Sequence, residues 1–169
     1  GTDATGYWES KGGIRGRYSQ IGFQNSSLGY PISPEYYDGR GWYQNYEGGA
    51  IIGTDTTGYW ESTGGIRERW SQIGYQGGFM GYPTSAVVWD GRGYWQNYEN
   101  GAIIGTDATG YWESKGGIRD YWAKLGYQNS MAGYPTSPEY YDGNSTWHQN
   151  YEHGVITYSE ITGISYTPY

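Results

Sequence analysis

The sequence predicts a mainly β tandem-repeat protein with one short helix per repeat, in which antiparallel hairpins stack as an array. Three observations predict this fold class. Nearly the same decapeptide, GTDATGYWES or GTDTTGYWES, starts at Gly1, Gly53 and Gly105, which gives a period of 52 residues. An Asp-Gly pair, which favours a β-hairpin, recurs in all three repeats, and an Asn-Gly pair adds a second such signal in the middle repeat. Aliphatic residues are so scarce that each repeat is expected to need its neighbours for stability.

The period divides the chain into three repeats and a remainder. We place repeat 1 at 1–52, repeat 2 at 53–104, repeat 3 at 105–156, and the closing hairpin of a partial fourth repeat at 157–169. The decapeptide at 1–10 lacks the strand that precedes it in the later copies. Either this N-terminal edge is open, or another chain or a removed segment covers it. An open edge is a natural place for pairing between molecules.

The first part of the middle repeat predicts a hairpin followed by a helix. Short strands at 50–52 and 59–61 flank the turn TDTTG, in which glycine can adopt positive φ. Ile66 and Trp70 then follow helical i, i+4 spacing, and a glycine occurs where a helix stop belongs. These features predict an amphipathic helix over 65–73.

The second part of the middle repeat predicts a meander of strands. After a proline-containing loop, which excludes helix, strands are expected at 87–89, 94–98 and 102–104. Asp90-Gly91 and Asn100-Gly101 lie between them and are strong hairpin signals. Each repeat therefore reads as a small antiparallel meander with one helix.

The composition limits the partners that this chain can bind. Its 22 Tyr and 9 Trp supply most of the apolar content, and the 31 Gly occur at fixed places as turn residues. The net charge of −7 disfavours nucleic acid and anionic membrane surfaces. No apolar run is long enough for membrane insertion. The lack of cysteine fits an exported bacterial protein as well as a cytosolic one.

A recurring four-residue motif suggests a family. It reads LGYP at 28–31, MGYP at 80–83 and AGYP at 132–135, each time between a helix that ends in Gly and a pair of strands. With these motifs ordered at one period, nearly the whole chain resembles the LGFP repeats of actinobacterial cell-wall proteins. Tyr takes the place of the Phe in that motif in all three copies.

The resemblance implies an extracellular module without catalytic activity, located at the cell wall or cell surface. In that family the repeats accompany cell-envelope enzymes and hold them on wall polysaccharide, so an arabinogalactan-like partner is implied. The family pattern also places apolar residues at nine aromatic positions of this chain, which are therefore expected in the core. These are Tyr18, Tyr30, Tyr46, Trp70, Tyr82, Tyr98, Trp122, Tyr134 and Tyr151.

Three tryptophans, each followed by glutamate, are the first candidates for contact with a polysaccharide. An exposed indole gives a flat apolar platform for a sugar ring, and repetition at a fixed period suits a polymer. The alternative is that each indole packs against the neighbouring repeat. In a strand, the indole and the adjacent carboxylate point to opposite faces. These candidates are Trp8, Trp60, Trp112, Glu9, Glu61 and Glu113.

A second aromatic pair occurs in the strand after the Asp-Gly turn. It is Trp42-Tyr43 in the first repeat and Tyr94-Trp95 in the second, with Trp147 in the third. Strand alternation predicts that about one ring of each pair is exposed. Glutamine follows each pair and could either bond to sugar hydroxyls or face water. The candidates from this strand are Trp42, Trp95, Trp147, Gln44, Gln96 and Gln149.

No pattern in the chain indicates catalysis or a cofactor. Glycoside hydrolysis needs two carboxyls in one cleft, whereas the carboxylates here recur three times without a unique pair. Asp38, Asp90 and Asp142 precede Gly in tight turns, which accounts for them. His148 and His153 have a spacing that is poor for zinc, and no loop has EF-hand spacing. We expect no enzyme activity, no cofactor and no metal site, with calcium dependence left open.

Two functions fit these observations. The first is multivalent binding of cell-wall polysaccharide by exposed aromatic rings, with weak single contacts that add up along a polymer. The second is a structural subunit that self-assembles end to end into an extracellular filament or surface layer, as a homo-oligomer joined through the open N-terminal edge.

Overall fold

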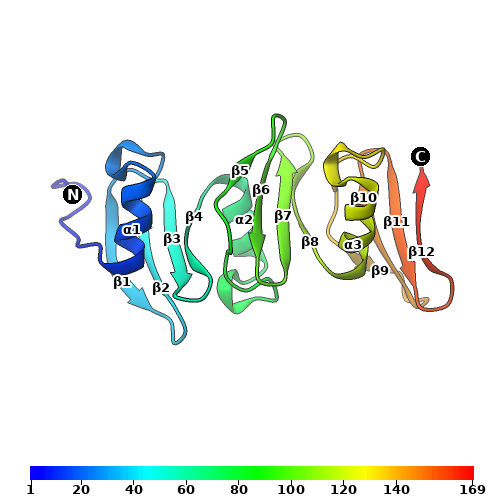
Figure 1. Cartoon of the computed structure of the whole chain (residues 1–169), viewed down its shortest axis with the longest axis horizontal. Coiled ribbons are helices and arrows are strands. Elements are labelled where there is room, and N and C mark those ends of the chain that lie inside the picture. Colours follow the sequence, from blue (N-terminus) through cyan, green and yellow to red (C-terminus); the bar gives the residue numbers. More distant parts are fainter. The chain divides into compact units, whose positions relative to one another are not determined.

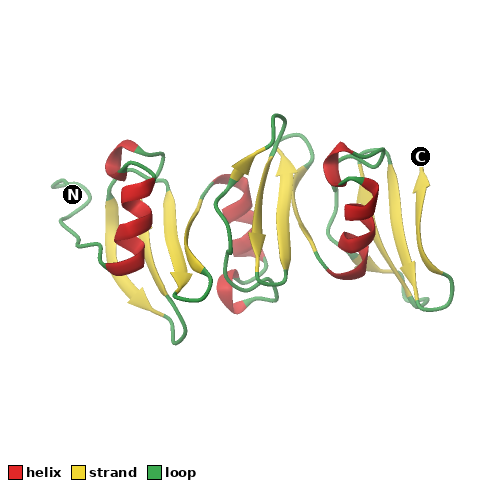
Figure 2. Ribbon diagram, in the orientation of Figure 1, coloured by secondary structure: helices red, strands yellow, loops and turns green.

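The computed structural model describes residues 1–169, which form two compact units. The first unit contains Gly1–Val87 and Gln96–Glu99, and the second contains Val88–Trp95 and Asn100–Tyr169. Along the chain, one helix and one four-stranded sheet alternate three times (Figures 1 and 2). The predicted fold class, mainly β with one short helix per repeat, is confirmed.

All three sheets are meanders, in which the strands follow one another in chain order. The elements of the first module are α1 (Gly12–Gln20), a 3-10 turn (Phe23–Asn25), β1 (Pro31–Tyr37), β2 (Trp42–Tyr46), β3 (Gly49–Thr54) and β4 (Gly58–Ser62). Those of the second are α2 (Gly64–Gln72), a 3-10 turn (Tyr75–Gly77), β5 (Val88–Trp89), β6 (Tyr94–Tyr98), β7 (Gly101–Thr106) and β8 (Gly110–Ser114). Those of the third are α3 (Gly116–Leu125), a 3-10 turn (Tyr127–Asn129), β9 (Tyr140–Tyr141), β10 (Thr146–Tyr151), β11 (Gly154–Ser159) and β12 (Gly163–Pro168).

Each folded module begins later than the sequence repeat but keeps its period. The decapeptide that opens a sequence repeat supplies the fourth strand of the preceding sheet, as GYWES does in β4 and β8. The boundaries after residues 52, 104 and 156 therefore fall inside β3, β7 and β11. The segment 157–169 supplies the end of β11 and all of β12, and so completes the third sheet.

The first copy of the decapeptide forms no strand. Its only ladder contact is a bridge between Thr2 and Gly6. Ser10 ties the end of the decapeptide to the first sheet, because its hydroxyl donates to Oε1 of Gln44 at 2.6 Å.

The helices form where the apolar spacing predicts them. In α2, Ile66 and Trp70 are buried one turn apart, and Gly74 adopts a left-handed conformation with φ of 96° just beyond the helix end. Nε1 of Trp70 donates to the carbonyl of Gly81 at 3.2 Å, so the polar atom of this buried ring is satisfied. No helix of the chain has the length and apolar content that crossing a membrane requires.

The first sheet buries side chains on both faces. Ile51 packs with Ile14 and Tyr18 of α1. The neighbouring Ile52 points to the opposite face, where it lines a hollow together with Trp70 of α2. Both isoleucines are almost completely buried. This arrangement explains why β3 is a continuous apolar run although the sheet is antiparallel.

Eight of the nine aromatic residues expected in the core are buried, with at most 6% exposure. Aromatic side chains of the helices lie against those of the strands, for example Trp122 against Tyr151 with ring centroids 5.3 Å apart. The exception is Tyr30, which is only half-buried.

Candidate functional site

The tryptophan of the GYWES motif is less available than expected. Trp8, Trp60 and Trp112 each donate Nε1 to the carbonyl of the threonine three residues earlier, at 2.8 to 2.9 Å. Trp8 is 42% exposed, but the other two are half-buried. The guanidinium of Arg17 also lies 4.9 Å from the ring of Trp60. Of the three indoles, Trp8 therefore offers the most open platform.

The glutamates that follow these tryptophans differ from one another. Glu9 is exposed and forms an ion pair with Lys11 at 2.8 Å. Glu61 accepts a hydrogen bond from Nε of Arg17 at 2.7 Å, and its side chain is only 14% exposed. Glu113 is 5% exposed. Burial therefore argues against the prediction that Glu61 and Glu113 contact a glycan.

The three candidate glutamines are structural residues. Gln44, Gln96 and Gln149 are completely buried. Each Nε2 donates to the glutamate carbonyl of a GYWES segment at 2.8 to 2.9 Å and to a serine carbonyl of its own module at 2.9 to 3.1 Å. Their amides join neighbouring segments and cannot reach a bound polysaccharide, so their prediction as glycan contacts is wrong.

Exposed rings gather instead on the first hairpin of each sheet. In the first module, Tyr37 and Trp42 lie opposite each other on β1 and β2, with ring centroids 5.0 Å apart. The same cross-strand arrangement recurs in the other modules, with centroids 4.7 and 5.2 Å apart. We call them the first, second and third aromatic pairs: Tyr37 with Trp42, Trp89 with Tyr94, and Tyr141 with Trp147.

Every ring of the three aromatic pairs is open to solvent. Their side chains are between 42% and 58% exposed, and the two rings of a pair are tilted by 43° to 50°. Each pair therefore presents a large apolar surface made of two rings that face in different directions. Such a surface can pack against the C–H faces of a sugar ring, while the strand backbone holds it in place.

The sequence identified half of this surface. Trp42 and Trp147 are exposed as expected, and the prediction that one ring of each adjacent pair points outward is confirmed. In the second module, however, Tyr94 is the exposed ring, whereas Trp95 packs against a core cluster of the second unit. The cross-strand partners were missed. The turn would have revealed them, because the residue before Asp-Gly faces the aromatic residue after the turn.

The tip of the first hairpin is bonded to the second module, inside the first unit. Asp38 closes its own turn by accepting the backbone N–H groups of Arg40 and Gly41 at 3.0 and 2.9 Å. It also accepts hydrogen bonds from Oη of Tyr82 and Nε2 of Gln76, both at 2.7 Å. The prediction that turn formation accounts for this aspartate is therefore incomplete.

Arg40 completes this contact. Its guanidinium lies 5.0 Å from the ring centroid of Tyr82, and NH1 donates to Glu99 at 2.9 Å. Glu99 in turn accepts the backbone N–H of Tyr82 at 2.9 Å. The same set of bonds recurs in the second unit, where the tip of the second hairpin contacts the third module. Its members are Asp90, Arg92, Gln128, Tyr134 and Glu152.

These bonds set the protonation of the contact. Burial would raise the pKa of the Asp38 carboxyl, but hydrogen bonds from Tyr82, Gly41, Arg40 and Gln76 outweigh it and hold the pKa below the ordinary value of 3.8. Burial and the bond to Asp38 raise the pKa of the Tyr82 phenol above 10. The phenol is therefore neutral and the carboxylate ionised over the whole neutral range.

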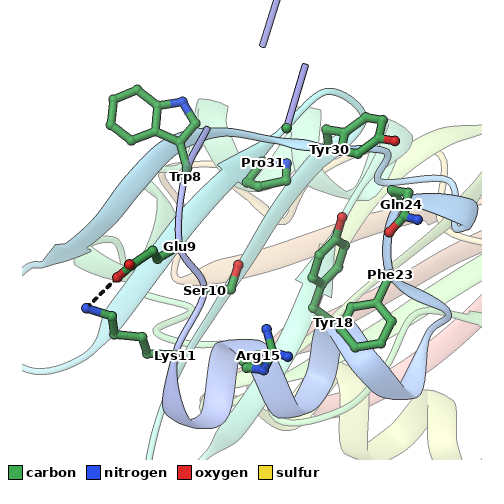
Figure 3. A pocket seen from close by; sticks show the side chains of 11 residues that line it. Trp8, Glu9, Ser10, Lys11, Arg15, Tyr18, Phe23, Gln24, Tyr30 and Pro31 are labelled. Atoms are coloured by element: carbon green, nitrogen blue, oxygen red, sulfur yellow. Dashed lines mark ion pairs between the residues drawn. The ribbon is translucent and has the colours of Figure 1, made fainter. Parts of the chain in front are cut away.

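A hollow of 620 Å³ lies on the first module beside α1 (Figure 3). Trp8 and Lys11 of the N-terminal segment, Arg15 and Tyr18 of α1, and Tyr30 are among its lining residues. Its walls combine aromatic rings with charged groups. No three His, Cys, Asp or Glu side chains of the chain converge on one point.

The fold and these contacts define a class of protein, a tandem array of helix-plus-meander modules that are joined through hairpin tips. The model of the LGFP repeat family matches residues 28–78 and 80–130, together more than half of the chain. The chain therefore belongs to the LGFP repeat family. No curated protein sequence matches it. The tyrosine at the Phe position of the motif is the residue whose Oη bonds to the hairpin tip in the second and third modules.

Proposed function

We propose that this chain is a non-catalytic extracellular module that binds a neutral cell-wall polysaccharide through its three aromatic pairs. The observation that carries the proposal is the repetition of one exposed ring pair at the same hairpin position in every module. Large aromatic side chains are normally well buried, and clusters that stay in water mark contact surfaces. The fold does not require these rings, because the core is built from other aromatic residues.

The hairpins that carry the first two pairs are held in place before any ligand binds. Asp38 and Asp90 fix their tips to the next module by several charge-assisted hydrogen bonds. A contact surface that is ordered in advance loses less entropy on binding, so a modest apolar contact can still give useful affinity.

Charge and repetition limit the class of ligand. At a net charge of −7 the chain repels strongly anionic polymers, so a neutral polysaccharide is favoured. Family membership supports an arabinogalactan-like polymer at the cell wall. Each aromatic pair offers one weak contact, and several contacts to one polymer raise the overall affinity by making the later ones intramolecular.

The test is co-sedimentation of the purified chain with insoluble arabinogalactan. A triple variant with Trp42→Ala, Trp89→Ala and Trp147→Ala should lose binding while its circular dichroism spectrum stays unchanged. A control variant removes three exposed apolar side chains that lie outside the first hairpin of each sheet, and it should bind like the parent chain. The control changes are Tyr7→Ala, Ile161→Ala and Tyr169→Ala. Equal binding by the triple variant and the parent chain would contradict the proposal. Release of reducing sugar during the incubation would contradict its non-catalytic part.

A single variant, Trp8→Ala, tests whether the polysaccharide binds to the GYWES indoles rather than to the aromatic pairs of the hairpins. Trp8 is the most exposed of those indoles but belongs to no aromatic pair. We expect it to change binding little. A loss as large as that of the triple variant would shift the site to the N-terminal decapeptide.

A further inference from the structure

The second and third modules each carry an acceptor site, which holds the hairpin tip of the preceding module. Each acceptor site consists of a glutamine from the 3-10 turn, the tyrosine of the Gly-Tyr-Pro loop and a glutamate after the second strand of the sheet. The second acceptor site is Gln76, Tyr82 and Glu99, and the third is Gln128, Tyr134 and Glu152.

The first module carries the same three residue types in the same arrangement, namely Gln24, Tyr30 and Glu47. We call them the first acceptor site. The backbone N–H of Tyr30 donates to Oε2 of Glu47 at 2.7 Å, as the N–H of Tyr82 does to Glu99. The local fold is therefore the same, with glycine at positive φ before the tyrosine in both modules.

The first and second acceptor sites differ in exposure. Beneath the hairpin tip Tyr82 is 2% exposed and Gln76 is half-buried, whereas Tyr30 is half-buried and Gln24 is exposed. Oη of Tyr30 has no hydrogen-bond partner within the chain. Figure 3 shows Tyr30 and Gln24 beside the hollow on the first module. The first acceptor site thus has its donors and its carboxylate turned to solvent.

We propose that the first acceptor site is a docking surface for an Asp-Gly-Arg-Gly hairpin tip from a preceding repeat of the same type. The aspartate of that tip would accept hydrogen bonds from Oη of Tyr30 and Nε2 of Gln24. Its arginine would lie over the ring of Tyr30 and pair with Glu47. All four contacts are those that Asp38 and Arg40 make with the second module.

The last glycine of the tip is part of this specificity. A Cβ at Gly41 would lie 2.8 Å from the ring of Tyr82 and 2.5 Å from the carbonyl of Gly53. Gly93 has the same close approach to Tyr134. A hairpin with a larger residue at this position cannot bring its aspartate and arginine into the site.

The hollow beside α1 fits the rest of such a repeat. Its lining residues Arg15 and Tyr18 correspond by the 52-residue period to Arg67 and Trp70 of α2. Arg67 and Trp70 line a hollow together with the outer face of the first sheet, including Ile52. The sheet of a preceding repeat would lie against α1 in the same way.

A second copy of this chain would fit this surface poorly. Its third hairpin has Asn144 where the other tips have arginine, and one extra residue, Ser145, with φ of 60°. Asp142 is already bonded to Nε2 of His148 at 3.1 Å. On the outer face of the third sheet, Thr157 replaces the isoleucine of the other sheets, which gives a more polar face.

The test extends the full chain by one repeat. A copy of residues 1–52 placed directly ahead of Gly1 recreates the natural junction between Ile52 and Gly53. Nitration of Tyr30 by tetranitromethane, followed by peptide mass spectrometry, reports its accessibility in the parent chain and in the extended protein. We expect Tyr30 to react about tenfold more slowly, or slower still, in the extended protein. Tyr82 and Tyr134 should react slowly in both proteins, which verifies the fold.

Two variants make the result specific. Asp→Asn in the added hairpin tip should restore the reactivity of Tyr30. Tyr30→Phe should lower the unfolding midpoint of the extended protein but leave that of the parent chain unchanged. Equal nitration of Tyr30 in the parent and extended proteins would overturn the proposal. Protection of Tyr30 in the parent chain that grows with protein concentration, or on addition of arabinogalactan, would equally overturn it and assign the surface to a second copy or to a glycan.

Discussion

Replacing Tyr82 by Phe removes a single oxygen atom from the contact between the first and second modules. The ring stays, so the packing of the buried side chain and the position of Arg40 above it are preserved. What is lost is the hydrogen bond from Oη to Asp38 at 2.7 Å. The variant therefore measures how much this bond stabilises the array.

The size of the loss follows from the partners. A hydrogen bond to a charged group contributes about 1.5 to 3 kcal/mol. Asp38 is exposed on one side and keeps three other donors, so water can replace part of the lost bond. We therefore expect a loss of about 1.5 kcal/mol in the free energy of unfolding, near the lower end of that range.

The chain supplies its own controls. Tyr134→Phe removes the equivalent bond to Asp90 and should cost the same amount. Tyr30→Phe removes an oxygen that bonds to nothing within the chain, so the free energy of unfolding should change by less than about 0.5 kcal/mol. Urea unfolding followed by tryptophan fluorescence measures all three variants. Equal stability of the Tyr82 and Tyr30 variants would refute the role given to the hairpin tip.

The remaining predictions concern stability. Gln96→Ala leaves the carbonyls of Glu61 and Ser85 without a partner and should cost about 1 to 3 kcal/mol in urea unfolding; an unchanged midpoint would contradict its structural role. Gly41→Ala should cost about 1 to 3 kcal/mol through overpacking. Gly16→Ala, at an open helix position, should instead be neutral or stabilise by about 1 kcal/mol. Stability should fall above pH 10. Burial raises the pKa of Tyr46 from 10.0 in the unfolded chain to about 12 in the folded chain, so its neutral phenol stabilises the fold below pH 10 and this contribution is lost as the pH rises to about 12. It should also fall below about pH 4, as the carboxylates of Asp38 and Asp90, whose pKa values hydrogen bonds hold below 3.8, become protonated; a flat profile at either end would contradict these assignments.

The elements of each module were predictable because their signals are local. Ile66 and Trp70 show the helix by their spacing, and the Asp-Gly and Asn-Gly pairs show the hairpins. The period and the LGYP motifs identified the family. These signals lie within a few residues of one another, so reading them required no knowledge of how modules pack.

The contacts between modules were not predictable in the same way. Asp38 and Tyr82 are 44 residues apart, and nothing in the sequence near either residue shows that they meet. The burial of Gln44 depends on the carbonyl of Glu9, which comes from a distant segment. Strand alternation placed one ring of each adjacent pair outward, but choosing between Tyr94 and Trp95 required the register of the hairpin.

Affinity electrophoresis through gels that contain soluble arabinogalactan tests the central claim most directly, because it can count the contributing pairs. Single variants at Trp42, Trp89 and Trp147 should each reduce the retardation of the chain, double variants should reduce it further, and the triple variant should migrate as in a gel without polysaccharide. Retardation that is unchanged in the triple variant would show that the exposed ring pairs are not the binding surface. Complete loss in one single variant, with none in the other two, would show one site rather than three.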